Sequence, residues 1–172
     1  IGPSFTEPQA VFDSAGVPVA HVVLEAPFRL SGAAVPADAD LVVVGNPTNP
    51  TGVLHRRDEI LGLRAPGRIV VVDEAFADAV PGEPESLAGR SLPDVVVLRS
   101  LTKTWSLAGL RVGYALGAPD VLARLTAQRP HWPLGTLQLE ALTACSAPAA
   151  VAEAESGARR LAELRAEMAA GL

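Results

Sequence analysis

The chain has 172 residues, of which 49% are hydrophobic and 19% are charged, and its formal net charge is −5. This composition is typical of a globular domain with a sizeable core and excludes a disordered or fibrous protein. The negative charge and the lack of a lysine-rich patch argue against nucleic acid or an anionic membrane as the main partner.

No apolar run approaches the roughly 20 residues of a membrane span, and the N-terminus has no basic region followed by a hydrophobic one. We therefore expect a cytoplasmic protein. The single cysteine, Cys145, excludes an internal disulfide and a cysteine-cluster metal site, and His21, His55 and His131 lack the spacing of metal ligands. We expect no metal site.

Hydrophobic runs and turn residues divide the chain into alternating strands and helices. An apolar helix face is expected at residues 10–12, where Ala, Val and Phe follow one another, and further helices at 56–63, 119–127, 137–145 and 149–168. Strands are expected at 17–24, 40–45, 67–73, 94–98 and 111–116. This alternation predicts an α/β fold, an α-β-α sandwich around a doubly wound, mostly parallel sheet.

Polar residues follow two of the apolar runs, at the carboxyl ends of strands, where open α/β sheets place their ligands. The first polar segment is Asn-Pro-Thr-Asn-Pro-Thr-Gly at residues 46–52, whose prolines and glycine fix a turn and whose asparagines offer amide hydrogens. The second polar position is Asp73, which ends a run of β-branched residues. From position alone, Asp73 could cap a helix or bind magnesium.

Lys103 is the only lysine of the chain, and the other basic residues are thirteen arginines. Arginine stays protonated in proteins, whereas a desolvated lysine can become neutral and form a Schiff base with a carbonyl. The pattern therefore indicates a position that needs an amine. An arginine-rich codon bias that left one lysine by chance is the alternative.

Hydroxyl and guanidinium groups surround this lysine. Ser100 and Thr102 precede it and Arg111 follows it, and together they can supply hydroxyl donors and a bidentate clamp for a phosphate dianion. An amine beside a phosphate clamp is what pyridoxal 5'-phosphate requires.

The stretch Ser-Leu-Thr-Lys-x-x-x-Leu-Ala-Gly-Leu-Arg-x-Gly, at residues 100–113, resembles the cofactor-lysine motif of fold-type I pyridoxal-phosphate enzymes in the class I/II aminotransferase family. The resemblance implies the major domain of such an enzyme, with one reversed strand after the lysine. It also implies that Asn49 donates to the phenolic oxygen of the cofactor. Asp73 would hold the pyridine nitrogen protonated, which makes the ring an electron sink.

The resemblance extends to two phenylalanines. Phe5 matches an aromatic ring that stacks on the cofactor, although a core phenylalanine at a strand end is the alternative. Phe76 stands where many members of the family have tyrosine, so a hydroxyl that shares the phenolic oxygen with Asn49 is missing. This departure puts ordinary transamination in doubt.

Within the family, Asp-Glu-Ala-Phe at 73–76 together with the lysine motif most resembles threonine-phosphate decarboxylase of cobalamin biosynthesis. Histidinol-phosphate aminotransferase of histidine biosynthesis is the alternative, and a catalytically silent truncated module is the second. The first two imply a phosphorylated amino compound as the substrate. Retention of the sole lysine favours an enzyme over a silent module.

The resemblance covers only the middle of the family's length. Residues 1–147 match a major cofactor-binding domain that is incomplete at its N-terminus. Residues 148–172 match the start of the helix that leads to a small domain, which is absent here. Enzymes of this kind are homodimers, so we expect a homodimer for the full-length protein, and weak cofactor binding and self-association for the isolated chain.

Overall fold

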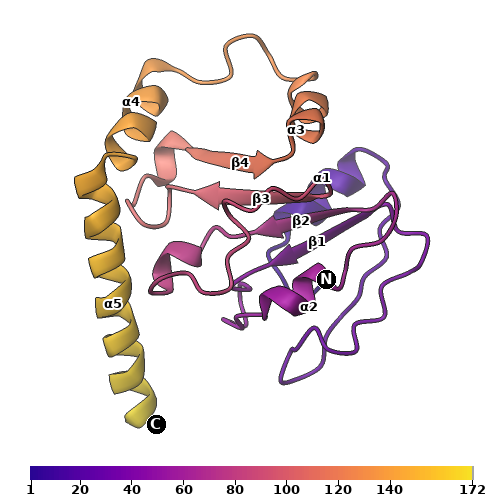
Figure 1. Cartoon of the computed structure of the whole chain (residues 1–172), viewed down its shortest axis with the longest axis horizontal. Coiled ribbons are helices and arrows are strands. Elements are labelled where there is room, and N and C mark those ends of the chain that lie inside the picture. The colour runs from indigo at the N-terminus through magenta and orange to yellow at the C-terminus, as the bar shows by residue number, and fades with distance from the viewer. Residues whose placement is uncertain (172) are drawn as a thin grey trace.

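Within residues 1–171, which the computed structural model describes, four strands form one sheet in the order β1-β2-β3-β4 (Figure 1). They are β1 (Leu41–Gly45), β2 (Ile69–Asp73), β3 (Val95–Ser100) and β4 (Gly113–Gly117). The first three strands run parallel, and β4 runs antiparallel to β3. The prediction of a mostly parallel α/β sheet with one reversed strand after the lysine is confirmed.

The helices are α1 (Glu7–Ser14), α2 (Arg57–Leu61), α3 (Pro119–Thr126), α4 (Thr136–Cys145) and α5 (Pro148–Ala170), with 3-10 turns η1 (Ala77–Ala79) and η2 (Ala108–Leu110). Proline in the first turn fits the start of α1, α3 and α5, because that position needs no amide hydrogen. As Figure 1 shows, α3 lies beside β4, and α5 passes along η1. No helix among residues 1–171 is long and apolar enough to cross a membrane.

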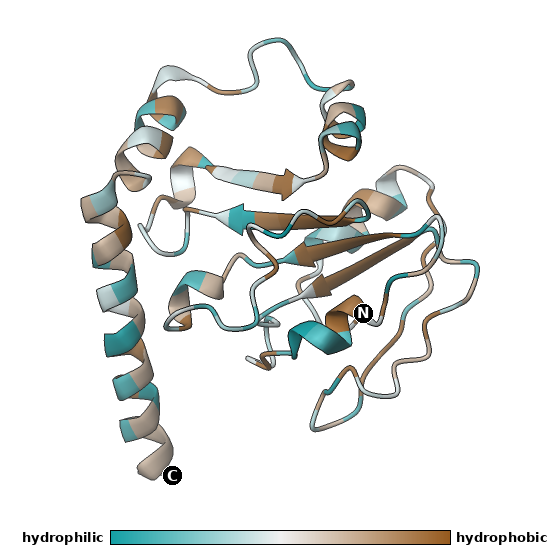
Figure 2. Ribbon diagram, viewed as in Figure 1, coloured by the Kyte–Doolittle hydropathy of each residue, from teal (hydrophilic) through white to brown (hydrophobic). Residues whose placement is uncertain are grey.

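The core lies where the β-branched runs of β1, β2 and β3 meet α2 and the loops around it (Figure 2). Val70 and Val72 of β2 are fully buried, and Ile60 of α2 packs into the same cluster with no exposed surface. Burial of each such side chain stabilises the fold by roughly 1.5–3 kcal/mol. This cluster holds the strand ends that carry the candidate site.

The predicted strand at 17–24 is wrong. This segment pairs only through an isolated bridge between Gly2 and Val23, and Val17 and Val19 are exposed. The physical reason is the lack of a partner strand: among residues 1–171 this segment bonds through Val22 and Leu24 to Gly2 and through Val17 to Phe12, so no ladder extends. Much of the rest of the run lines a cavity instead.

The helix expected to carry Ala10, Val11 and Phe12 forms as α1, although none of its residues is buried and Val11 is 59% exposed. One further expectation needs correction. The reversed strand begins at Gly113 rather than at Arg111, because Arg111 has a left-handed backbone (φ 53°), which interrupts an extended strand.

Candidate active site

The candidate site lies at the carboxyl ends of the three parallel strands. Asp73 is the last residue of β2, Asn46 follows β1 directly, and Lys103 comes shortly after the end of β3. A cavity of about 830 Å³ lies here, within the usual size of a small-molecule pocket. Five predicted site residues line it: Phe5, Asn49, Asp73, Phe76 and Lys103. The fold thus brings together side chains that are far apart in the sequence.

The two asparagines of the loop at 46–52 differ in their surroundings. The buried side chain of Asn46 accepts from the His55 amide (2.8 Å) and donates to the His55 carbonyl (3.3 Å). Gly52 takes a left-handed backbone (φ 68°) and donates its amide to the Thr48 carbonyl at 2.7 Å. Asn46 is therefore structural, whereas Asn49 is exposed at the cavity.

Sequence reasoning missed His55, which is only 2% exposed. Its Nε2 lies 3.1 Å from the Thr48 hydroxyl, and its Nδ1 makes no hydrogen bond within the described residues. Burial lowers the pKa of His55, partly offset by the charge of Glu59. A neutral His55 thus supports the loop that presents Asn49. No ligand spacing marks it in the sequence, so only the fold could reveal it.

Asp73 serves two purposes. One oxygen, Oδ1, accepts a hydrogen bond from the Ala75 amide at 3.1 Å and so caps the turn after β2. The half-buried side chain also lines the cavity. A capping role, as weighed from the sequence, and a position at the cavity are therefore compatible.

Lys103 is exposed at the cavity, and its Nζ lies 5.4 Å from the centroid of the Phe76 ring. This distance is within the range of a cation-π contact. The turn around Lys103 is held by backbone hydrogen bonds from Trp105 to Leu101 (3.3 Å) and from Leu107 to Thr102 (3.1 Å). The amine is thus carried on a fixed turn and faces an aromatic surface.

The three residues predicted to bind phosphate lie near the lysine but do not line the cavity. The Ser100 and Thr102 hydroxyls bond each other at 2.6 Å, and Arg111 donates to the Ala108 carbonyl at 3.2 Å. Ser100 pairs with Gly113, and the Leu101 amide donates to the Val112 carbonyl at 3.1 Å, so the backbone next to Arg111 lies against the segment that leads to the lysine. Their role toward a phosphate stays a prediction.

An amine, a carboxylate and an amide thus line one cavity at the strand ends of an α/β sheet. The family model described as aminotransferase class I and II matches residues 3–172. The chain belongs to the class I and II aminotransferase family.

A relative from Mycobacterium tuberculosis strain H37Rv, named histidinol-phosphate aminotransferase, is 72% identical over 170 residues. The match covers 99% of this chain and 47% of that protein, so the chain spans about half the length of this relative.

Solved structures share the fold. L-threonine-O-3-phosphate decarboxylase from Porphyromonas gingivalis matches with a TM-score of 0.69 at 25% identity, over 83% of this chain and 44% of that one. Histidinol-phosphate aminotransferase from Sinorhizobium meliloti, solved in complex with pyridoxal-5'-phosphate, gives a TM-score of 0.70 at 21% identity, over 96% and 45% of the two chains. The second likeness, at this identity, shows the fold alone.

Proposed function

We propose that the protein is a pyridoxal-phosphate-dependent aminotransferase whose substrate is a phosphorylated amino compound, with histidinol phosphate as the amino donor. The observation that carries the proposal is that the sole lysine lines the same cavity as Asp73 and Asn49. The family supports the cofactor. The name of the 72% identical relatives supports the substrate.

The residues of the cavity fit the ring of the cofactor. Its pyridine ring supplies an electron sink when bound. The Asp73 carboxylate, fixed by the Ala75 amide, would hold a proton on the ring nitrogen. Asn49 would donate to the phenolic oxygen, and Phe5, half exposed at the cavity wall, would cover one face of the ring.

Lys103 would supply two functions from one amine. Its Nζ would bind the aldehyde carbon of the cofactor and, once the substrate has taken that place, would move the proton at the substrate α-carbon. The exposed side chain on a fixed turn suits this exchange, because the amine must leave and return. Ser100, Thr102 and Arg111 would bind the phosphate from beside this turn.

The comparisons reverse the order of the two substrates that the sequence favoured. Threonine-phosphate decarboxylase is found as a structural neighbour at 25% identity, whereas the relatives at 72% identity carry the name histidinol-phosphate aminotransferase. One observation keeps the decarboxylase as a second candidate: Phe76, which lines the cavity, has no hydroxyl to share the phenolic oxygen with Asn49.

The test uses the complete gene product with pyridoxal phosphate. With histidinol phosphate and 2-oxoglutarate, we expect glutamate to form. With threonine phosphate, we expect no aminopropanol phosphate and no carbon dioxide. The reverse pattern would establish the decarboxylase, and activity only on unphosphorylated amino acids would refute both assignments.

A further inference from the structure

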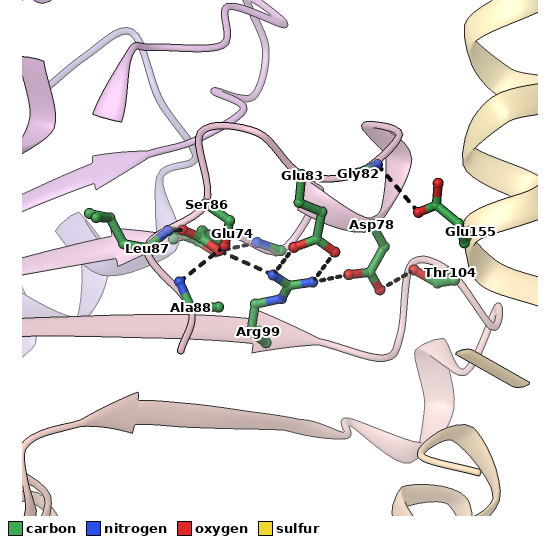
Figure 3. Close-up of polar contacts among 12 residues, drawn as sticks. Glu74, Asp78, Gly82, Glu83, Ser86, Leu87, Ala88, Arg99, Thr104 and Glu155 are labelled. Carbon is green, nitrogen blue, oxygen red and sulfur yellow. Dashed lines mark hydrogen bonds and ion pairs between the residues drawn. The ribbon is translucent and has the colours of Figure 1, made fainter. Parts of the chain in front are cut away.

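We propose that Arg99 and Asp78 form a polar brace that positions Lys103 relative to Asp73, with Thr104 as the residue through which the brace reaches the lysine. The inference rests on the proposed function, because it concerns the placement of the cofactor-binding amine. The brace is the set of contacts among Glu74, Asp78, Arg99 and Thr104 (Figure 3).

Arg99 forms the centre of the brace. It belongs to β3, and its side chain is only 8% exposed although it carries a charge. The guanidinium binds both Glu83 oxygens, at 2.6 and 2.7 Å, and also donates to Asp78. Burial opposes its charge, but the hydrogen bond to Glu83 and the charges of Glu83 and Asp78 outweigh this, so the pKa of Arg99 is raised. The guanidinium is therefore a permanently charged donor whose two terminal nitrogens each bond to two carboxylates.

One arm of the brace leads to the lysine. The Thr104 hydroxyl donates to Asp78 Oδ2 at 2.7 Å, while Oδ1 of the same carboxylate accepts from Arg99. Thr104 directly follows Lys103, so this bond fixes the turn that carries the amine. A hydrogen bond to a charged acceptor is stronger than a neutral one.

The other arm leads to the aspartate. Glu74 directly follows Asp73, and its fully buried carboxylate accepts from Arg99 at 3.1 Å. It also accepts from the Ser86 hydroxyl at 2.6 Å and the Leu87 amide at 2.7 Å. Its lone pairs are thus well satisfied, which fixes the end of β2. The Arg99 guanidinium therefore contacts Glu74 directly and is linked to Thr104 through Asp78. These two residues directly follow Asp73 and Lys103, which would hold the cofactor.

Arg99 itself is a poor test position. Its loss would leave the buried Glu74 without its cation, which is strongly destabilising. The partly exposed end of the brace is better suited, because Thr104→Val removes one hydroxyl, keeps the shape and leaves the ion pairs intact. Thr104→Ser restores the hydroxyl. Thr143→Val is the matched control, since the Thr143 hydroxyl bonds only to the Leu139 carbonyl of its own helix.

The measurements use the complete gene product. Without cofactor, amide hydrogen exchange is followed over residues 103–107; with cofactor, affinity and the pH midpoint of visible absorbance are followed. We expect Thr104→Val to speed exchange in this turn and weaken cofactor affinity, each about tenfold, the scale of one charge-assisted hydrogen bond. The pH midpoint should also shift. Thr104→Ser should behave like the wild type within about twofold, and Thr143→Val should be unchanged.

The two proposals fail separately. If the wild type binds no pyridoxal phosphate, the proposed function is wrong. If the wild type binds it but Thr104→Val matches Thr143→Val in exchange, affinity and pH midpoint, the brace does not position the lysine. A loss of thermal stability in Thr104→Val that Thr104→Ser restores, with exchange and pH midpoint unchanged, would show a merely structural bond and would also overturn the inference.

Discussion

Lys103 and Phe76 face each other across the candidate site, with the lysine Nζ 5.4 Å from the centroid of the ring. The two residues come from different turns, one after β3 and one after β2, and both line the cavity. The ring offers a π-face but no hydroxyl. The identity of residue 76 should therefore tune the cofactor without being needed to hold it.

Phe76→Tyr tests this relationship. The added hydroxyl can donate to the phenolic oxygen of the cofactor, and a hydrogen bond to an anionic oxygen favours its anionic form. We expect the pH midpoint of the cofactor's visible absorbance to fall, as measured by spectrophotometric titration. Phe12→Tyr, at another ring that lines the cavity, is the control and should leave the midpoint unchanged. An unchanged or raised midpoint in Phe76→Tyr would show that residue 76 does not reach that oxygen.

Gly113→Ala should destabilise the fold. A Cβ at Gly113 would lie 2.6 Å from the Arg99 carbonyl oxygen of the paired strand, and backbone cannot yield as a side chain can. We expect a loss of about 1–3 kcal/mol in the free energy of unfolding, measured with denaturant. Gly157→Ala in α5, where nothing lies within 4 Å, should instead gain about 0.5–1 kcal/mol. Equal effects of the two changes would contradict the close approach of β3 and β4.

His55 should make stability fall in weakly acidic solution. Because burial lowers its pKa from 6.5, the unfolded chain takes up the proton first as the pH falls. The contribution is therefore fully present above the unfolded pKa and is lost as the pH falls below it. His55→Gln should flatten this part of the stability profile, measured by denaturant unfolding at a series of pH values. His21→Gln, at an exposed histidine, is the control; equal slopes in both variants would refute the assignment to His55.

The outer face of α5 should govern association of the isolated chain. Leu161, Leu164 and Met168 are 47%, 37% and 70% exposed, and each Å² of apolar surface left in water costs roughly 25 cal/mol. We expect the 172-residue chain to self-associate and to bind pyridoxal phosphate weakly, without turnover, in light scattering and cofactor titration. Met168→Glu should reduce the association, and Arg165→Glu should not.

We also propose that the complete gene product is a homodimer. Its light scattering and cofactor titration are the comparison for the isolated chain. An isolated chain that is monomeric, with the affinity and turnover of the complete gene product, would contradict the predicted self-association and weak cofactor binding.

The polar residues at the strand ends could be predicted from the sequence because each lies next to the run of apolar residues that forms its strand. Asp73 and Asn49 each follow a β-branched run, and such runs seldom form anything but buried strands. The brace could not be predicted in this way. Arg99 lies inside a strand and looks like a surface cation, and only long-range packing brings Glu74 and Asp78 to it. The segment at 17–24 failed for the same reason, since pairing depends on a neighbour that periodicity does not reveal.

Reduction with borohydride identifies the amine that holds the cofactor. The complete gene product is incubated with pyridoxal phosphate, reduced, digested and mapped by mass spectrometry, with Lys103→Arg as the control. If Lys103 holds the cofactor, the pyridoxyl adduct is found on the peptide that contains it, and Lys103→Arg carries none while keeping its fold. An adduct on another amine, with Lys103 unlabelled, would contradict the role assigned to Lys103.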